Sequence, residues 1–175
     1  MVEYKLTSSN TDETMEIGRQ LAKFLMAGDV VAFWGDLGSG KTYFIKGICE
    51  GLKIEDDVTS PTFTIMNIYE GDLSVYHFDF YRIDMKVDVY GLGYEEYFYG
   101  NGICLIEWAN RIESFLPDER IEIHIDNSVF ESSDDERHIV IRMIGQDVEN
   151  RSKSDSEAIL GKLIQKERRI YLDSP

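Results

Sequence analysis

Cysteine is nearly absent from this chain. Cys49 and Cys104 are the only two among 175 residues, and they form neither a CxxC pair nor the spacings of a disulfide framework. Both stand among apolar neighbours, so we expect buried thiols that fill space in the core. The sequence therefore gives no indication of a redox site or a structural zinc site.

Long hydrophobic runs are also missing. No apolar segment approaches the roughly 20 residues that a membrane-spanning helix needs. The first residues, MVEYK, lack the basic stretch, apolar run and small-residue cleavage site of a secretory signal. We therefore expect a soluble, cytoplasmic protein that makes no contact with a membrane.

Basic residues are few compared with acidic ones. The chain has 18 lysines and arginines against 33 aspartates and glutamates, which gives a net charge of −15. Proteins bind nucleic acids largely by neutralising phosphates, so a chain this acidic is expected to bind RNA or DNA poorly by itself. If nucleic acid takes part in the function, partner proteins have to hold it.

The order of the predicted elements indicates an α/β domain. Asn10 and Glu13 form a capping box at the start of the first helix, and Gly28 is the expected stop. Residues 29–34 are nearly all apolar, as in a central strand covered on both faces. A helix is predicted at residues 41–52, and further strands at 4–7, 63–69, 73–80, 103–106, 120–125 and 138–143. This order predicts a three-layer sandwich of the P-loop NTPase type, with a mixed, mostly parallel central sheet.

The end of the chain is predicted to form an extension. We assign residues 1–145 to the P-loop domain and residues 146–175 to a C-terminal extension. A capped helix is expected to open at Ser154, with apolar residues at helical spacing, namely Ile159, Leu160, Leu163 and Ile164. Two interpretations stay open, since this helix belongs either to the same domain or to a contact with a partner.

Residues 35–42 read GDLGSGKT and match the phosphate-binding pattern GxxxxGK[ST]. Glycines let successive backbone N–H groups point inward, and the N-terminus of the following helix adds positive potential. Lys41 supplies a charge for the β and γ phosphates, and the Thr42 hydroxyl is expected to coordinate magnesium. The loop residues expected to bind ATP are Asp36, Leu37, Gly38, Ser39, Gly40, Lys41 and Thr42.

Two acids at strand ends are candidates for the carboxylate that P-loop sites place near magnesium. Glu107 follows the apolar run ICLI, as in a Walker B strand, and we expect it to hold magnesium together with Thr42. Asp79 ends a different predicted strand and is expected to position the attacking water or to make a second magnesium contact. Lys41, Asp79 and Glu107 are therefore the predicted catalytic residues.

Other polar and aromatic residues near the predicted site carry weaker signals. Thr59, Ser60 and Thr62 follow the P-loop helix, where they form either a nucleotide-sensing switch or a proline-bearing turn. All three histidines, His77 among them, fall within predicted strands, and we interpret them as residues that fill sheet positions. Trp108 follows Glu107 and is interpreted as an exposed anchor near the site.

Four blocks of this sequence resemble, in their order and spacing, the bacterial TsaE family, formerly called YjeE. They are GDLGSGKT at residues 35–42, SPTF at 60–63, YHFDFYR at 76–82 and LIEWANR at 105–111. The motifs LP at 116–117 and EIHI at 122–125 extend the resemblance, which covers roughly residues 1–145. The four blocks together are specific, whereas the P-loop alone is shared by many families.

The resemblance implies an ATPase that works with the TsaB and TsaD proteins. Together they make N6-threonylcarbamoyladenosine at position 37 of tRNAs that read codons beginning with adenine. The family is associated with ATP-dependent resetting of the TsaB–TsaD complex, so tRNA is reached only through these partners. The family also places phosphates on residues 38–42, magnesium on Thr42 and Glu107, a reaction acid at Asp79, and the nucleotide base near Thr11.

Two departures from the family pattern and two competing functions remain. Tyr43 stands where the family often has a second threonine, and about 25 residues from Arg151 lie beyond the part that matches. A P-loop small-molecule kinase is one alternative, although no paired arginines of the kind that clamp a transferred phosphoryl group are visible. A nucleotide-gated binding module without turnover is the other.

Overall fold

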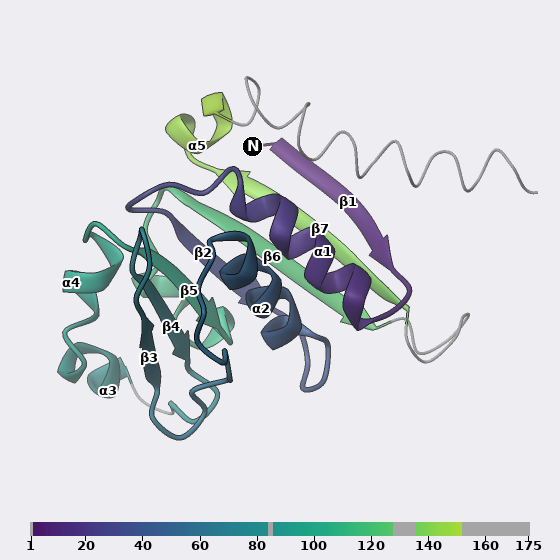
Figure 1. Ribbon diagram of the computed structural model, residues 1–175. Helices are drawn as coiled ribbons and strands as arrows, with labels where there is room; N and C mark the ends of the chain where they lie inside the picture. The colour runs from purple at the N-terminus through teal and green to yellow at the C-terminus, as the bar shows by residue number, and fades with distance from the viewer. Residues whose placement is uncertain (1, 84–85, 128–135, 152–175) are drawn as a thin grey trace, which may run out of the picture.

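The computed structural model describes residues 2–83, 86–127 and 136–151, which form an α/β fold (Figure 1). The strands are β1 (Val2–Ser8), β2 (Val30–Trp34), β3 (Met66–Tyr69), β4 (Val75–Asp79), β5 (Ile103–Glu107), β6 (Arg120–Asn127) and β7 (Arg137–Ile144). The helices are α1 (Thr11–Ala22), α2 (Lys41–Gly51), α3 (Lys86–Gly91), α4 (Tyr94–Phe98) and α5 (Gln146–Arg151). Two 3-10 helices, η1 (Ala109–Arg111) and η2 (Glu113–Phe115), follow β5.

All of these strands belong to one sheet, in the order β1-β7-β6-β2-β5-β4-β3. The central pairings β6–β2, β2–β5 and β5–β4 are parallel. The outer pairings β1–β7, β7–β6 and β4–β3 are antiparallel. The predicted mixed sheet with a parallel centre is therefore confirmed. Because β2, β4 and β5 run in the same direction, the segments that follow them emerge at one edge of the sheet.

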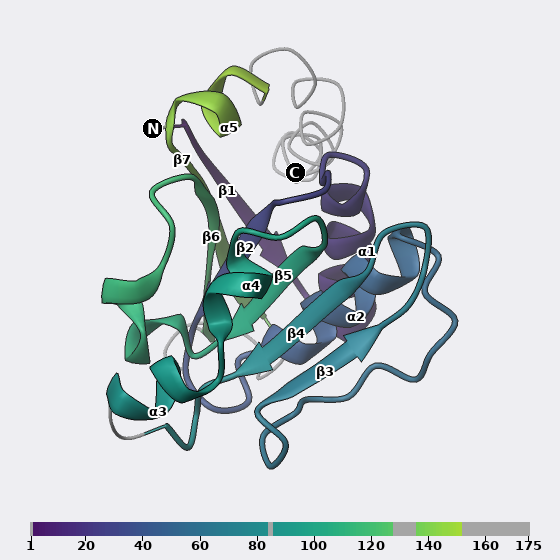
Figure 2. The ribbon, with the colours of Figure 1, turned by 90° about the vertical axis from the view of Figure 1, so that its left-hand side faces the viewer.

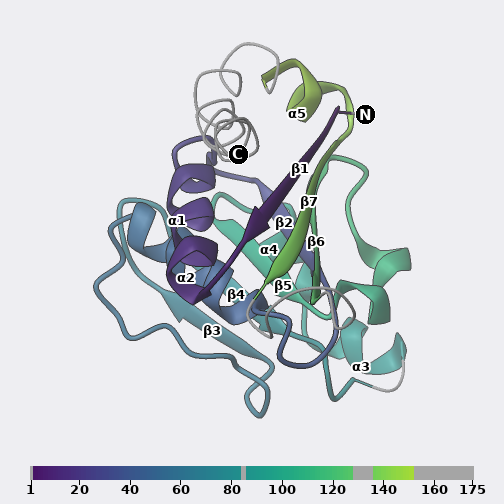
Figure 3. The same cartoon turned by 90° about the vertical axis from the view of Figure 1, so that its right-hand side faces the viewer.

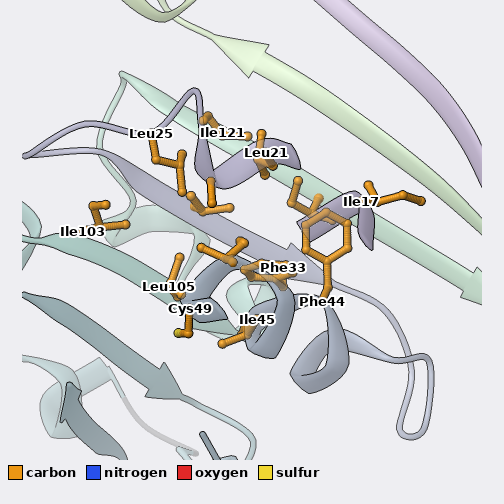
Figure 4. Packing of buried hydrophobic residues seen from close by; sticks show 14 of the residues in the cluster. Ile17, Leu21, Leu25, Phe33, Phe44, Ile45, Cys49, Ile103, Leu105 and Ile121 are labelled. Carbon is orange, nitrogen blue, oxygen red and sulfur yellow. The ribbon is translucent and has the colours of Figure 1, made fainter. Parts of the chain in front are cut away.

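Helices cover both faces of the sheet, which confirms the predicted three-layer sandwich (Figures 2 and 3). Alternate residues of β2 pack into the two helical layers, because successive side chains of a strand point to opposite faces of the sheet. Val31 and Phe33 pack with residues of α1 and α2, and Figure 4 shows Phe33 beside Phe44 in this layer. Val30 and Ala32 belong to the second cluster, with residues of α3 and α4.

The start of α1 follows the predicted capping pattern, except that Glu13 bonds to the amide of Ser9 and not to that of Asn10. The end of α1 does not follow the prediction. Asn10 Oδ1 accepts a hydrogen bond from the Glu13 amide at 2.9 Å, and Glu13 Oε2 accepts one from the Ser9 amide at 2.8 Å. The Gly28 stop is wrong, because α1 ends at Ala22. The next turn carries Phe24 and Leu25 into the core, and their amides bond to carbonyls three residues back, so the α-helical pattern ends there.

The strand predicted at residues 63–69 is shorter than expected. A turn precedes β3, in which the Ile65 amide donates to the Pro61 carbonyl at 2.7 Å. Ile65 has a φ of 70°, in the left-handed region that interrupts a strand. The remaining predicted strands overlap the observed ones. Cys49 and Cys104 are buried as predicted, and burial raises the pKa of each thiol to about 12.

The expected C-terminal extension is only partly within the described residues. The helix predicted from Ser154 lies outside them. The first residues of the extension form α5, which is attached to the domain at both ends. The Gln146 amide donates to Glu119 Oε1 at 2.9 Å, and Arg151 Nη2 donates to Asp29 Oδ1 at 2.6 Å. Among the helices of the described part, none has the length and apolar character needed to cross a membrane.

The contact between α1 and α2 leads to a stability prediction. A Cβ atom on Gly47 would lie 2.0 Å from the Met15 carbonyl oxygen, so Gly47→Ala has to push the two helices apart. We expect a loss of about 1–3 kcal/mol in the free energy of unfolding, the usual cost of overpacking. Urea denaturation followed by circular dichroism measures it. Gly91→Ala is the control, since a Cβ there meets no atom within 4 Å. Equal stability of the two variants would contradict the prediction.

Candidate nucleotide-binding site

The predicted site residues meet at the edge where β2, β4 and β5 end. A cavity of about 270 Å³ opens there, between the P-loop, the loop after α2 and the ends of β4 and β5. Its lining residues are Leu37, Gly38, Gly40, Lys41, Thr42, Tyr43, Ser60, Thr62, Asp79, Tyr81, Glu107 and Trp108. The structure therefore brings together the predicted catalytic residues and most of the predicted phosphate-binding loop.

The P-loop curls around the side chain of Lys41. Gly38 and Gly40 have φ values of 81° and 107°, which residues with a Cβ rarely adopt. Lys41 Nζ donates to the carbonyl oxygens of Gly35 at 2.7 Å and Asp36 at 2.9 Å. The lysine is only 4% exposed, so its ammonium group lies at the base of the loop. Two backbone carbonyls of the loop therefore fix the position of the ammonium group.

Trp108 covers the same ammonium group from the other side. Lys41 Nζ lies 4.2 Å from the centroid of the Trp108 ring, which is a cation–π contact. Trp108 has a φ of 59°, a left-handed conformation that is unusual for a bulky residue. The interpretation of Trp108 as an exposed anchor is therefore wrong, because the half-buried indole packs on Lys41 and on the ring of Tyr81.

Charges around Lys41 act on it in opposite directions. Burial lowers the pKa of Lys41, while the carboxylates of Glu107, Asp79 and Asp36 raise it. The lysine thus lacks water but has acids around it. Phosphate groups entering the cavity would supply the anionic partner that a buried ammonium group favours.

Glu107 joins β5 to the start of α2. It is 3% exposed, and its Oε1 accepts a hydrogen bond from Thr42 Oγ1 at 2.9 Å. Hydroxyl and carboxylate oxygens are ligands that magnesium prefers, so this pair fits the ion. The described residues contain no group of three or more His, Cys, Asp and Glu arranged to hold a metal. Magnesium at this pair would therefore depend on further oxygens from a nucleotide and from water.

Asp79 holds the loop that follows α2. It faces Glu107 in the register of β4 and β5. Its Oδ2 accepts hydrogen bonds from Ser60 Oγ at 2.5 Å and Thr62 Oγ1 at 2.7 Å, and its Oδ1 accepts one from the Tyr81 amide. Ser60 and Thr62 thus tie their loop to the predicted acid, and both interpretations of this loop stay open. Thr59 is held elsewhere, since its amide donates to Tyr69 of β3.

Three predicted nucleotide-binding residues do not line the cavity. Thr11 begins α1 and is partly exposed, and Asp36 is exposed and contributes its carbonyl to Lys41. Ser39 is buried, and its hydroxyl has no hydrogen-bond partner among the described residues. An unsatisfied buried hydroxyl beside the loop is consistent with a polar ligand in place of a protein partner. The roles of Thr11 and Asp36 remain predictions.

His77 fills a sheet position in β4, as predicted, and it also contacts a predicted site acid. It is fully buried, and its Nε2 lies 3.0 Å from Glu107 Oε1. The signal was present in the sequence, because alternate residues of a strand share a face and His77 precedes Asp79 by two positions. His77 and Asp79 therefore lie on the same face of β4, beside Glu107.

The fold and the site define a protein of the P-loop type. The family model described as threonylcarbamoyl adenosine biosynthesis protein TsaE matches residues 8–139. The tRNA threonylcarbamoyladenosine biosynthesis protein TsaE of Bacillus subtilis (strain 168) is 45% identical over 146 residues, which cover 83% of this chain and 89% of the relative. The TsaE protein of Treponema pallidum (strain Nichols) is 39% identical over 121 residues, or 69% of this chain and 90% of the relative.

A solved structure agrees with these relatives. The crystal structure of YdiB from Bacillus subtilis matches with a TM-score of 0.75 and 40% sequence identity, covering 89% of this chain and 95% of that chain. The chain belongs to the TsaE family. The resemblance seen in its four sequence blocks is therefore confirmed.

The hydrogen bonds to Asp79 predict how the loop responds to their loss. In Asp79→Ala the hydroxyls of Ser60 and Thr62 lose their acceptor, and we expect amides at residues 59–65 to exchange with deuterium at least about tenfold faster. Two lost hydrogen bonds at about 1 kcal/mol each account for this magnitude. Mass spectrometry of nucleotide-free protein measures the exchange. Asp72→Ala, in the exposed β3–β4 turn, is the control, and equal exchange of the loop in both variants would contradict the role of Asp79.

Proposed function

We propose that this chain binds ATP with magnesium and hydrolyses ATP in support of tRNA threonylcarbamoyladenosine biosynthesis. Membership of the TsaE family is the basis for the biosynthetic role. The observation that carries the nucleotide role is the hydrogen bond from Thr42 Oγ1 to Glu107 Oε1. This bond joins the first turn of the P-loop helix to the acid at the end of β5, as a magnesium–nucleotide site needs.

The predicted site residues divide the tasks of nucleotide binding in this proposal. Backbone amides of residues 38–42 and the Lys41 ammonium group bind the phosphates. Thr42 and Glu107 hold magnesium, which when bound neutralises charge on the β and γ phosphates. Asp79 accepts a hydrogen bond from the attacking water and so orients it. The hydroxyls of Ser60 and Thr62 donate to the same carboxylate, so their loop is expected to move when the hydrogen bonds of Asp79 change.

We expect slow turnover by the isolated chain because of the surroundings of Asp79. Both of its carboxylate oxygens already accept hydrogen bonds, from two hydroxyls and from the Tyr81 amide. A carboxylate engaged in this way has little capacity to orient water. A rearrangement of the loop at residues 59–62 would release it. We therefore expect hydrolysis to depend on partners.

The partners in this proposal are the TsaB and TsaD proteins, with tRNA reached only through them. The net charge of −15 disfavours direct contact with RNA. Apolar side chains stand at the cavity, where Leu37 is 77% exposed, and on the adjoining loop, where Phe63 is 82% exposed. Exposed apolar groups beside a site are typical of a surface that another protein covers.

The kinase alternative finds no support among the residues that line the cavity. Its described lining residues include no arginine. The Arg82 guanidinium group stacks on the Phe63 ring, and Arg111 donates to the Ile83 carbonyl. The partners of these two arginines, Phe63 and Ile83, are not among the residues that line the cavity.

Lys41→Ala tests the nucleotide site. Removal of the ammonium group that the P-loop encloses should lower the affinity for ATP by about 100-fold or more, because a fixed charge for the phosphates is lost. Calorimetric titration with ATP and magnesium measures this, and circular dichroism verifies the fold. Lys23→Ala, an exposed lysine after α1, should bind as the unchanged protein does. Unchanged affinity in a folded Lys41→Ala protein would exclude the proposed site.

Nucleotide-dependent association tests the proposed partners. Purified TsaB–TsaD complex should bind this chain at least about tenfold more tightly with a non-hydrolysable ATP analogue than without nucleotide, as expected for coupled sites. Calorimetry with the analogue, with ADP and without nucleotide measures the three affinities, and a tRNA titration of this chain alone should give no binding. Equal affinities would exclude nucleotide control. Absence of any association would favour the kinase alternative.

A further inference from the structure

His77 is a buried polar side chain to which the proposed function gives no task. It lies on β4 opposite Leu105 of β5, two positions before the pair formed by Asp79 and Glu107. Its Nε2 is 3.0 Å from Glu107 Oε1, and no solvent reaches its side chain. The other ring nitrogen, Nδ1, is buried without a hydrogen-bond partner among the described residues.

Packing alone does not explain a histidine at this position. Val75 occupies the same face of β4 and packs in the core that α1 and α2 cover. An apolar residue would fill the position of His77 without leaving a buried nitrogen unsatisfied, and such a nitrogen carries a desolvation cost. The hydrogen bond to Glu107 is therefore the favourable contact that offsets this cost.

The unpartnered nitrogen also identifies the donor. Because Glu107 offers a carboxylate oxygen, the ring nitrogen that faces it has to carry the proton. The tautomer with its proton on Nε2 leaves Nδ1 as a lone pair, in agreement with the absence of a hydrogen-bond partner beside it. His77 Nε2–H thus donates to Glu107 Oε1.

The two donors to Glu107 meet on one oxygen. Thr42 Oγ1 and His77 Nε2 both contact Oε1, from α2 and from β4. Within the described residues, no hydrogen bond is directed at Oε2. Two donors on a single oxygen fix the rotation of the carboxylate plane and leave the second oxygen available.

We propose that His77 is a positioning residue for the magnesium site. Its Nε2–H fixes the Glu107 carboxylate so that Oε1 stays on Thr42 and Oε2 is available to magnesium or to a water that magnesium holds. This inference rests on the proposed function. Hydrogen bonds from outside the ligand shell commonly orient carboxylate ligands, and their loss typically costs 10-fold to 100-fold in metal affinity.

Three substitutions of His77 separate positioning from packing. In His77→Gln the amide nitrogen extends about as far as Nε2 and still donates to Glu107. In His77→Asn the amide is one methylene shorter and does not reach it, although the residue is equally polar. His77→Leu removes the donor and keeps an apolar volume. His124→Leu is the matched control, since His124 forms a similar contact with Glu122 on β6, at 3.3 Å.

The measurement is the binding of a fluorescent ATP analogue by the full chain, titrated with magnesium and repeated in EDTA. We expect His77→Leu and His77→Asn to raise the half-saturating magnesium concentration by about tenfold or more. Binding in EDTA should stay unchanged, because the phosphate contacts of the P-loop remain. His77→Gln should restore the magnesium dependence to within about threefold, and His124→Leu should leave it unchanged.

Each outcome decides between the readings of the site. If His77→Leu does not fold, the pair His77→Asn and His77→Gln decides. An unchanged magnesium dependence in the folded variants, or an equal loss of binding with and without magnesium, overturns the positioning role and leaves the proposed function intact. A wild-type chain without magnesium-dependent binding overturns both.

Discussion

Burial of the Glu107 carboxylate is the constraint on which the site depends. A carboxylate that is 3% exposed is stable only where donors replace water. Those donors come from Thr42 on α2 and His77 on β4, and the parallel pairing of β4 with β5 places His77 beside Glu107. A shift of one residue in β5 would turn Glu107 toward the opposite layer, because alternate side chains point to opposite faces. The pairing of the central strands therefore determines the chemistry of the site.

The position of α2 depends in turn on how closely it packs against α1. A Cβ on Gly18 would lie 2.4 Å from the Phe44 carbonyl, and one on Gly47 would lie 2.0 Å from the Met15 carbonyl. Each helix thus presents a glycine to the backbone of the other. Lys41 and Thr42 stand at the first turn of α2, so this contact between helices sets where the ammonium and hydroxyl groups reach the cavity. Core packing and phosphate binding are linked through one helix.

Local patterns predicted the parts of the site that depend on local structure. The P-loop is a contiguous run, and Glu107 directly follows its apolar strand, so both were recognisable without a structure. The hydrogen bonds from Ser60 and Thr62 to Asp79 join residues 17 and 19 positions apart, and no periodicity indicates them. The contact between Trp108 and Lys41 depends on a left-handed backbone at Trp108, which residue type disfavours. Such contacts follow only from the assembled fold.

Glu107 and Asp79 differ in the structural elements that supply their hydrogen-bond donors. Glu107 is held by Thr42 of the P-loop helix and by His77 of a central strand, both within regular secondary structure. Asp79 is bonded to a loop whose hydroxyls are also suitable donors for a phosphate oxygen. In the proposed function, the γ phosphate competes with Asp79 for these hydroxyls, so the event that draws the loop toward the nucleotide also frees the acid. The exposed Phe63 lies on the same loop and would move with it. One exchange of hydrogen bonds then links readiness for hydrolysis to a surface that a partner can contact.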